Sequence, residues 1–490
     1  MDELTNETNE IPVESPVENT EENTRPVNPR RKKKSQLQIF KEAYLPAVIA
    51  GVALLLILIF VIGSITRAVK KHKVEKDASI AASSSVAAQE AAWQAEADKL
   101  LAQAAEQAAG YDYVGAIDTI DSFSGDISAY EDLMNKRTEY VNAQSQMTEW
   151  SDPSDVTNLS FQMLVADSAR AYADEDYGSA YESNFITTTE FQKILEQLYA
   201  NGYMLVSYDN FITTTTNADG TVSYTSRSLY LPSGKKPLMI TQTNVNYCLY
   251  MVDGDDDGYA DKDGAGFASR LVVGADGKIT CEMVDAEGNT VTGAYDLVPI
   301  LDAFIEAHPD FSFGGAKATL AVTGYNGLFG YRTDSDSKER LTAEEYNAEL
   351  QGAAAIINAL RADGYTFACY TYSNIGYGDE ELTAIQEDLA SWNSEVTPLL
   401  GQTDILVYAM NSDIGDTGAY SGDKFNALRS AGFKYFIGFC TSGDRWVNIE
   451  TDYIRQGRIM VTGSNLEDNA TWFSGMFDAA SVLDSTRDSE

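Results

Sequence analysis

The chain has 490 residues, enough for roughly two to four domains and a large hydrophobic core. Its 35 Lys and Arg residues are outnumbered by 74 Asp and Glu residues, which gives a formal net charge of -39. So acidic a protein repels phosphate backbones, and we exclude nucleic acid as a partner.

The N-terminal segments predict a cytosolic tail and a membrane anchor. Residues 1–42 are rich in Glu, Asn, Thr and Pro, which is typical of disorder, and they include the basic cluster RRKKK. Residues 43–66 contain no charged side chain. A helix over these residues, with a rise of about 1.5 Å per residue, is long enough to cross a hydrocarbon core of roughly 30 Å. We expect a single uncleaved transmembrane helix; the alternative is a buried helix of a soluble core.

The orientation of this helix depends on the basic residues beside it. They flank both ends, so their number alone barely decides the orientation. The compact RRKKK cluster before the helix suits an anionic inner leaflet. We therefore place the protein in the cell membrane as a single-pass protein with its large C-terminal part outside the cytoplasm.

Two helical segments are expected next. Residues 67–110 are dense in Ala, Gln and Glu and end at Gly110, which predicts a helical stalk. Residues 111–150 place apolar residues on one helical face before and after a break at Ser124. This pair resembles one tetratricopeptide-like hairpin, which would space the main domain from the membrane or bind a protein partner.

Residues 156–490 alternate between strand and helix patterns. Short apolar runs predict strands at 159–164, 203–208, 237–241, 318–323, 366–370, 405–409, 434–439 and 459–462. Amphipathic helices are expected at 188–202, 342–364 and 423–432, each stopped by a glycine. The alternation predicts an α/β fold with parallel strands, either a β/α barrel or a doubly wound sheet. Hairpin inserts are expected at 217–224 and 272–293.

Five sequence blocks between about residues 157 and 465 resemble, in order and spacing, those of the polysaccharide deacetylases, a carbohydrate esterase family. The blocks are FITTTEFQKILEQLYANGYMLVSYDNF, PLMITQTN, DGYTFACYTYSN, DILVYAMNSD and KFNALRSAGFKYFIGF. The resemblance implies a deformed (β/α) barrel that removes acetyl groups from peptidoglycan or chitin-like sugars. Members are often tethered outside the membrane, which agrees with the orientation above.

The family's active-site residues are replaced in this chain. Its chemistry uses a metal held by one Asp and two His, an Asp base and a late His acid. The resemblance places the base at Thr243 and the three metal ligands at Asn244, Tyr370 and Asn374, and no histidine lies near IMVTGSNL. An amide brings no charge, and a phenol with a pKa of about 10 stays protonated at neutral pH. We expect a degenerate barrel site with no metal and no catalytic residue.

The two histidines of the chain offer no substitute. His72 lies among juxtamembrane lysines, and His308 ends a helix beside Pro309. Neither follows a predicted strand, where this fold places its chemistry.

Other residues near predicted strand ends suit stacking on sugar rings and bonding to hydroxyls. The candidate glycan-binding residues are Asn246, Tyr372, Asn411, Asp413, Asp416 and Trp446. The alternative is that they are ordinary loop residues of an acidic surface. If an altered enzyme survives, Asp413 and Asp416 are the candidates for its base.

The insert after the third strand contains the acidic stretch DGDDDGYADKDG. Asp253, Asp255, Asp257 and Asp261 occupy the carboxylate positions of a calcium loop, with Gly258 at the turn. The twelfth position is Gly264 where a bidentate Glu belongs, so the match is partial. The loop is either a calcium site or a solvated acidic hairpin tip.

The four cysteines show no CxxC pairing, which argues against a zinc knuckle or a redox motif. They either form one or two disulfides or remain buried thiols.

These patterns lead to one functional hypothesis and two alternatives. We expect a membrane-anchored, extracytoplasmic deacetylase-like protein, catalytically degenerate, that binds or scaffolds cell-wall polysaccharide or peptidoglycan. One alternative is an active metal-dependent deacetylase. The other is an interaction protein that acts through the helical hairpin.

Overall fold

The computed structural model describes residues 77–487 except 256 and 417. The expected tail, transmembrane helix and first part of the stalk lie outside these residues. Across the described segments, no helix is both long and apolar enough to cross a membrane. The chain divides into two units, 1–91 and 92–490, and the account below concerns the second.

Three helices precede the main domain. They are α3 (Asp77–Ala109), α4 (Tyr113–Asp121) and α5 (Glu131–Gln144). Ala104, Ile120 and Leu133 are buried together in a small core of their own. The chain turns at Ser124, whose hydroxyl donates a hydrogen bond of 2.6 Å to Glu96 on α3. Ser124 lies in the loop between α4, which ends at Asp121, and α5, which begins at Glu131.

Seven parallel strands close into a barrel. In order around the ring they are β2 (Thr157–Phe161), β7 (Lys236–Thr243), β11 (Thr319–Val322), β12 (Thr366–Cys369), β13 (Ile405–Val407), β14 (Tyr435–Phe439) and β16 (Ile454–Met460), which pairs with β2. The expectation of a β/α barrel is thus confirmed over the doubly wound alternative. Strand β3 (Tyr203–Leu205) pairs with the first residues of β7, whereas β11 pairs with its last residues. The two strands share one edge of β7, which distorts the ring.

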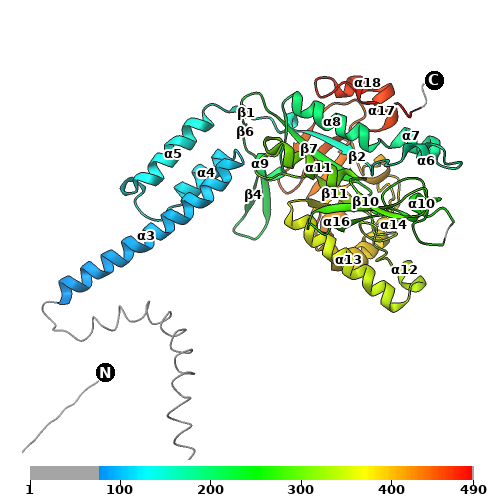
Figure 1. Ribbon diagram of the computed structural model, residues 1–490. Coiled ribbons are helices and arrows are strands. Elements are labelled where there is room, and N and C mark those ends of the chain that lie inside the picture. The colour runs from blue at the N-terminus through cyan, green and yellow to red at the C-terminus, as the bar shows by residue number, and fades with distance from the viewer. Residues whose placement is uncertain (1–76, 256, 417, 488–490) are drawn as a thin grey trace, which may run out of the picture. The chain divides into compact units, whose positions relative to one another are not determined.

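Helices cover the outside of the barrel (Figure 1). The longer ones are α8 (Thr188–Ala200), α11 (Leu297–Ala307), α13 (Ala343–Ala362), α14 (Leu382–Ser391) and α16 (Asp423–Ser430). Capping boxes start two of them: Thr187 pairs with Glu190 on α8, and Thr342 pairs with Glu345 on α13. Such reciprocal bonds satisfy backbone donors that a helix start leaves unpaired. The helices expected at 188–202, 342–364 and 423–432 are confirmed.

Smaller elements decorate the loops. Hairpins are formed by β4 (Ile212–Thr216) with β5 (Val222–Ser226), and by β8 (Arg270–Val273), β9 (Ile279–Val284) and β10 (Thr290–Gly293). Strand β1 (Thr148–Trp150) pairs with β6 (Leu229–Leu231), and β15 (Val447–Ile449) pairs with β16. Short helices are α6 (Ser168–Tyr172), α7 (Gly178–Asn184), α9 (Tyr208–Phe211), α10 (Leu249–Val252), α12 (Ser335–Arg340) and α15 (Thr397–Leu400). Both predicted hairpin inserts are present.

A hydrogen-bonded network of buried polar side chains fills part of the barrel interior. The amide of Asn158 on β2 donates to Gln456 on β16 at 3.1 Å and accepts from the Thr241 hydroxyl on β7 at 3.0 Å. The Tyr208 hydroxyl also donates to Gln456, at 2.6 Å. Because buried polar groups are costly unless paired, this network is stable only when all three strands are in register.

The C-terminal segment packs against the start of the domain. It contains α17 (Gly463–Asp468) and α18 (Ala479–Val482), which contact α7 and α8 (Figure 1). Its Arg487 forms a buried ion pair with Glu190, with bonds of 2.6 and 2.9 Å. The same guanidinium donates to the carbonyl oxygens of Glu182 and Phe185. The end of the chain therefore fixes α7 and the residues that follow it.

Candidate functional site

A pocket of about 510 Å³ opens where five barrel strands end. It is lined by five amides (Gln162, Asn184, Asn244, Asn374, Asn411), four tyrosines (Tyr177, Tyr181, Tyr250, Tyr370) and four apolar residues (Ala180, Phe185, Met410, Met460). These residues follow β2, β7, β12 and β13, end β16, or belong to α7 and α10. The carboxyl ends of parallel strands are where barrel enzymes place their sites.

Three of the four degenerate positions meet in this pocket. Asn244, Tyr370 and Asn374 all line it, although up to 130 residues separate them in the chain. Thr243 does not: its buried hydroxyl donates to the Phe161 carbonyl oxygen on β2 at 3.2 Å. A residue whose only polar atom is bonded to the neighbouring strand cannot serve as a base for a ligand in the pocket.

The backbone around the pocket is strained. Asn244, Thr371, Asn374, Met410 and Asn411 have φ values of 58°, 62°, 55°, 52° and 54°. Non-glycine residues rarely adopt this left-handed conformation, which costs of order 1–3 kcal/mol each. Such strain persists only where the surrounding structure enforces it, and it is concentrated at functional sites. Here it lies just beyond β7, β12 and β13, where those strands deliver residues to the pocket.

Asp388 on α14 holds the turn that carries Asn374. Its buried carboxylate accepts hydrogen bonds from the backbone N–H groups of Tyr372 at 2.7 Å and Ser373 at 2.8 Å, and from the Tyr377 hydroxyl at 2.6 Å. These three hydrogen bonds fix the turn from the side of α14. Sequence reasoning missed Asp388, because a polar residue on a helix does not indicate which loop its side chain will contact.

Two pocket amides differ in how their oxygens are paired. The Asn244 Oδ1 atom accepts from the Thr323 hydroxyl at 3.5 Å and weakly from the Cys248 thiol at 3.9 Å. The buried Oδ1 atom of Asn374 has no hydrogen-bond partner in the described part of the chain. A buried acceptor without a donor is costly, so this atom is the natural anchor for a ligand O–H or N–H group.

A buried arginine lies behind Tyr370. The Arg458 guanidinium is fully buried, interacts with the Tyr370 hydroxyl and donates to three backbone carbonyls, those of Tyr408, Ile437 and Gly438. Within residues 77–487 it makes no salt bridge, and burial lowers its pKa. The charged group that contacts Tyr370 is therefore a cation.

Tyr181 of the pocket remains neutral. Burial raises its pKa well above the ordinary tyrosine value. Its phenol therefore acts as a hydrogen-bonding and apolar surface, not as a base.

The predicted glycan-binding residues are scattered. Asn411 lines the pocket. Asn246 is fully buried, and its amide bonds to backbone atoms of Thr323 and Gly327. The Tyr372 hydroxyl donates to Glu395 at 2.6 Å. Asp416 is exposed and does not line the pocket. Of the candidates beyond the degenerate positions, only Asn411 reaches the site.

Asp413 and Trp446 belong to a separate cluster on the outside of β14 and β16. The Asp413 carboxylate pairs with Arg455 at 3.1 Å and accepts from the Tyr420 hydroxyl. The Arg455 guanidinium stacks on Tyr420 at 3.7 Å and lies 5.4 Å from the Trp446 ring. Burial raises the pKa of Asp413 despite these partners. The carboxylate is occupied and lies away from the pocket, which argues against the role of base considered from the sequence.

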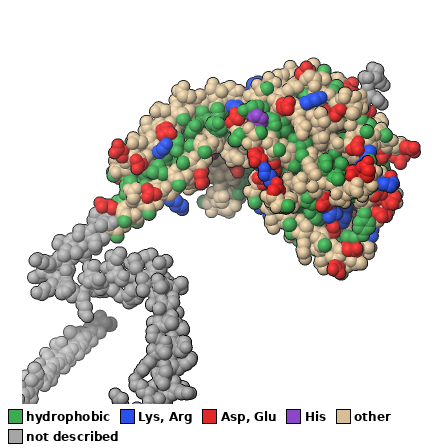
Figure 2. All heavy atoms as spheres, in the orientation of Figure 1, with side chains coloured by type: hydrophobic (Ala, Val, Ile, Leu, Met, Phe, Trp, Pro, Cys, Tyr) green, Lys and Arg blue, Asp and Glu red, His purple; other side chains and the backbone are tan. Residues whose placement is uncertain are grey.

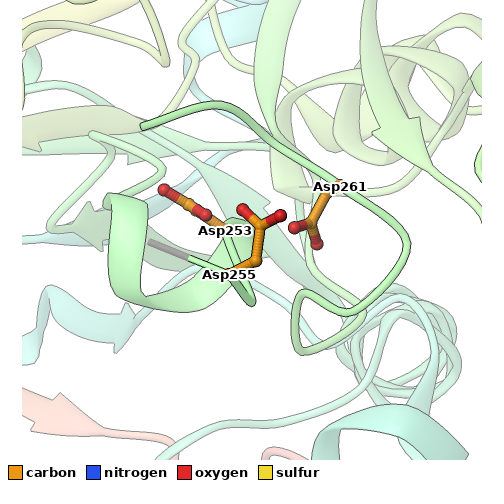
Figure 3. A group of neighbouring side chains, drawn as sticks. All are labelled: Asp253, Asp255 and Asp261. Carbon is orange, nitrogen blue, oxygen red and sulfur yellow. The ribbon is translucent and has the colours of Figure 1, made fainter. Parts of the chain in front are cut away.

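The acidic loop gathers three of its four predicted carboxylates. One oxygen each from Asp253, Asp255 and Asp261 lie within 4.8 Å of one another, and Figure 3 shows the Asp255 and Asp261 carboxylates turned towards each other. Asp257 instead accepts from the Tyr259 backbone N–H at 2.9 Å. Desolvation and then repulsion by Asp257 raise the pKa of Asp255. These carboxylates suit calcium in type and spacing, and calcium binding here stays a prediction.

The remaining sequence candidates have structural roles. His308 caps α11 and stacks against Tyr199 at 4.4 Å and Phe304 at 4.7 Å, as the cap interpretation expects. The four cysteines are buried free thiols, so the disulfide alternative is wrong. None of the cysteines lines the pocket.

Comparison with known proteins gives little beyond this geometry. No family model and no curated protein matches the chain. A solved structure, the Streptococcus pyogenes deacetylase PplD in complex with acetate, aligns with 64% of this chain and 95% of its own at 11% identity and a TM-score of 0.30. A likeness of this degree carries no argument about the site.

Sequence reasoning missed most of one pocket wall. Tyr177, Ala180, Tyr181, Asn184 and Phe185 come from α7 and its flanks. The segment YGSAYESNF is short and polar, so its periodicity predicts no helix. The signal that was available is its place after β2, because loops that follow barrel strands build the site.

Proposed function

We propose that the barrel is a degenerate, deacetylase-like domain that binds a cell-wall glycan, of the peptidoglycan or chitin type, without hydrolysing it. One observation carries this proposal. None of the thirteen described residues that line the pocket is Asp, Glu, His, Lys, Arg or Cys. The chain as a whole has 74 acidic residues, and Figure 2 shows acidic side chains scattered over the face in view.

Hydrolysis of an acetyl group needs a Lewis acid or a proton acceptor at the reacting carbonyl. Amide oxygens and protonated phenols hold divalent transition metals poorly, because they bring no negative charge. Thr243, at the position of the base, is bonded to β2. The pocket therefore has neither a set of metal ligands nor a base.

The same residues suit recognition of a polyhydroxylated ligand. Five amides offer both donors and acceptors, and the tyrosines offer apolar faces with polar edges. The pocket volume of about 510 Å³ is in the usual range for small-molecule sites. It is large enough for one or two sugar units.

The expected transmembrane helix and basic cluster complete the proposal. They would anchor the domain outside the cytoplasm, where cell-wall glycan is found. Treatment of intact cells with an external protease tests this placement. Loss of an epitope tag at the C-terminus supports it, and full protection of the tag from the protease contradicts it.

Two measurements on the purified full-length protein test the function. The first is acetate release from acetylated chito-oligomers and from peptidoglycan with zinc or cobalt present, and we expect none. The second is binding of the same ligands by calorimetry and pull-down, which we expect to be positive. Acetate release would establish the active-deacetylase alternative instead. Absence of both would leave the helical hairpin as the working part of the protein.

A further inference from the structure

Exposed apolar side chains gather at the pocket mouth. Across the described residues, the large apolar side chains with high exposure are Met134, Val141, Tyr177, Tyr250, Tyr259, Val273 and Met410. Three of these seven line the pocket: Tyr177 is 46% exposed, Tyr250 is 42% exposed and Met410 is 66% exposed. Exposed apolar side chains that gather in one place mark a surface that binds a ligand or another molecule.

The two exposed tyrosines form a braced platform. The ring centroids of Tyr177 and Tyr250 lie 5.6 Å apart, with their planes inclined at 54°. Tyr181 supports both of them: its ring lies 5.9 Å from Tyr177, and its hydroxyl donates to the Tyr250 carbonyl oxygen at 3.4 Å. Arg487 fixes this wall from behind through the Phe185 carbonyl at 2.8 Å. The platform therefore exists before a ligand arrives, which lowers the cost of binding.

Polar groups deeper in the pocket determine which ligand groups can bind opposite the two tyrosines. The unpartnered Asn374 Oδ1 atom needs a donor. The fully buried guanidinium of Arg458 lies behind Tyr370 and interacts with its hydroxyl. No carboxylate is among the described residues that line the pocket, so an ammonium group placed there would lose its hydration without gaining a carboxylate partner.

We propose that the pocket mouth is a stacking subsite for one pyranose ring with uncharged substituents, and that it rejects sugars that carry an ammonium group. The apolar face of the ring lies on one of the two tyrosines, Tyr177 or Tyr250, and its edge contacts the other, while a hydroxyl or amide N–H of the sugar donates to Asn374 Oδ1. This proposal rests on the proposed glycan-binding function and specifies its site and its selectivity.

Calorimetry with full-length protein and three tetrasaccharides tests the subsite. The probes are cellotetraose and tetra-N-acetylchitotetraose, which are neutral, and chitotetraose at mildly acidic pH, where its amines are protonated. Tyr177→Ala and Tyr250→Ala should each weaken binding of the neutral probe that binds best by about tenfold, whereas the Phe variants retain the stacking face and stay within about twofold. Tyr259→Ala is the matched control, because Tyr259 is an exposed tyrosine outside the pocket. The cationic probe should bind at least about tenfold more weakly than tetra-N-acetylchitotetraose.

The outcomes separate the two proposals. If the wild-type protein binds neither neutral probe, the proposed function fails and the subsite fails with it. If it binds one and both Ala variants bind equally well, the function stands and the stacking subsite is overturned. Equal binding of the cationic probe overturns the charge selectivity. Thermal unfolding of each variant identifies a loss caused by misfolding, and a Phe variant that binds as weakly as its Ala counterpart also overturns stacking.

Discussion

Arg487→Gln removes the cation from the most deeply buried ion pair of the domain. Arg487 is 7% exposed and Glu190 is 0% exposed. The substitution leaves the Glu190 carboxylate without its guanidinium and removes the Arg487 hydrogen bonds to the carbonyls of Glu182 and Phe185. An uncompensated buried charge is among the largest single-residue penalties in proteins.

The expected loss of folding free energy is about 3–5 kcal/mol, the usual cost of removing one partner of a buried pair. For the roughly 330 residues of the barrel domain, the unfolding entropy of about 2.1 cal/mol/K per residue converts each kcal/mol into about 1.4 °C. We therefore expect the midpoint of thermal unfolding to fall by about 4–7 °C.

Differential scanning calorimetry measures the shift, and two further variants interpret it. The double variant Glu190→Gln/Arg487→Gln should be less destabilised than Arg487→Gln alone, because it leaves no buried charge. Lys278→Gln is the control: its pair with Glu306 is 63% and 68% exposed, and such pairs contribute at most about 1 kcal/mol. Hydrogen exchange of residues 177–186 should rise in Arg487→Gln, since that wall loses its brace.

Two results would refute this reasoning. One is a midpoint for Arg487→Gln that lies within about 1 °C of that for Lys278→Gln. The other is a double variant that is no more stable than Arg487→Gln alone, which would show that the unpaired Glu190 charge does not cause the loss.

Three further predictions concern the site, a buried acid and the acidic loop. Converting Asn244 to Asp and both Tyr370 and Asn374 to His should create zinc binding, measured by calorimetry against wild type, for which we expect none. No binding by the triple variant would show that these positions do not converge as metal ligands. Burial raises the pKa of Asp296, so its ionisation weakens the folded state. Urea unfolding should show wild type losing stability relative to Asp296→Asn as pH rises from about 3.9 through the folded pKa, and a rise instead would contradict the burial. Calcium should raise the unfolding midpoint of wild type more than that of Asp255→Asn, and equal midpoints would remove the calcium hypothesis.

The barrel was predictable because most of its strands are continuous apolar runs, which is how strands buried on both faces read in sequence. Strands β2 and β16 are exceptions. Strand β2 reads TNLSF and was predicted at 159–164, and β16 was predicted from residue 459, whereas it begins at Ile454. Its first part contains Arg455, Gln456 and Arg458, all buried. Their partners are Asp413, Asn158 and the carbonyls of β14 and its neighbours, and those partners are invisible in a local window.

The pocket was predictable only in part, for a related reason. The resemblance of the sequence blocks pointed to Asn244, Tyr370 and Asn374, and all three line the pocket. Asn246 was assigned to the same cleft, yet its amide turns inward to Thr323. Which of several neighbouring polar residues faces a ligand depends on backbone φ values such as those after β7, and single-sequence patterns do not specify them.

The closure between β2 and β16 has a consequence for biosynthesis. Residue 159 on β2 pairs with residue 459 on β16, so the first strand of the ring cannot complete its pairing until β16 has been synthesised. Contacts of such long sequence separation form slowly, and until they form, both strands offer unpaired edges to other chains. Almost the whole domain must therefore be synthesised before the barrel can close. We expect nascent chains truncated before Ile454 to need holdase chaperones to avoid aggregation.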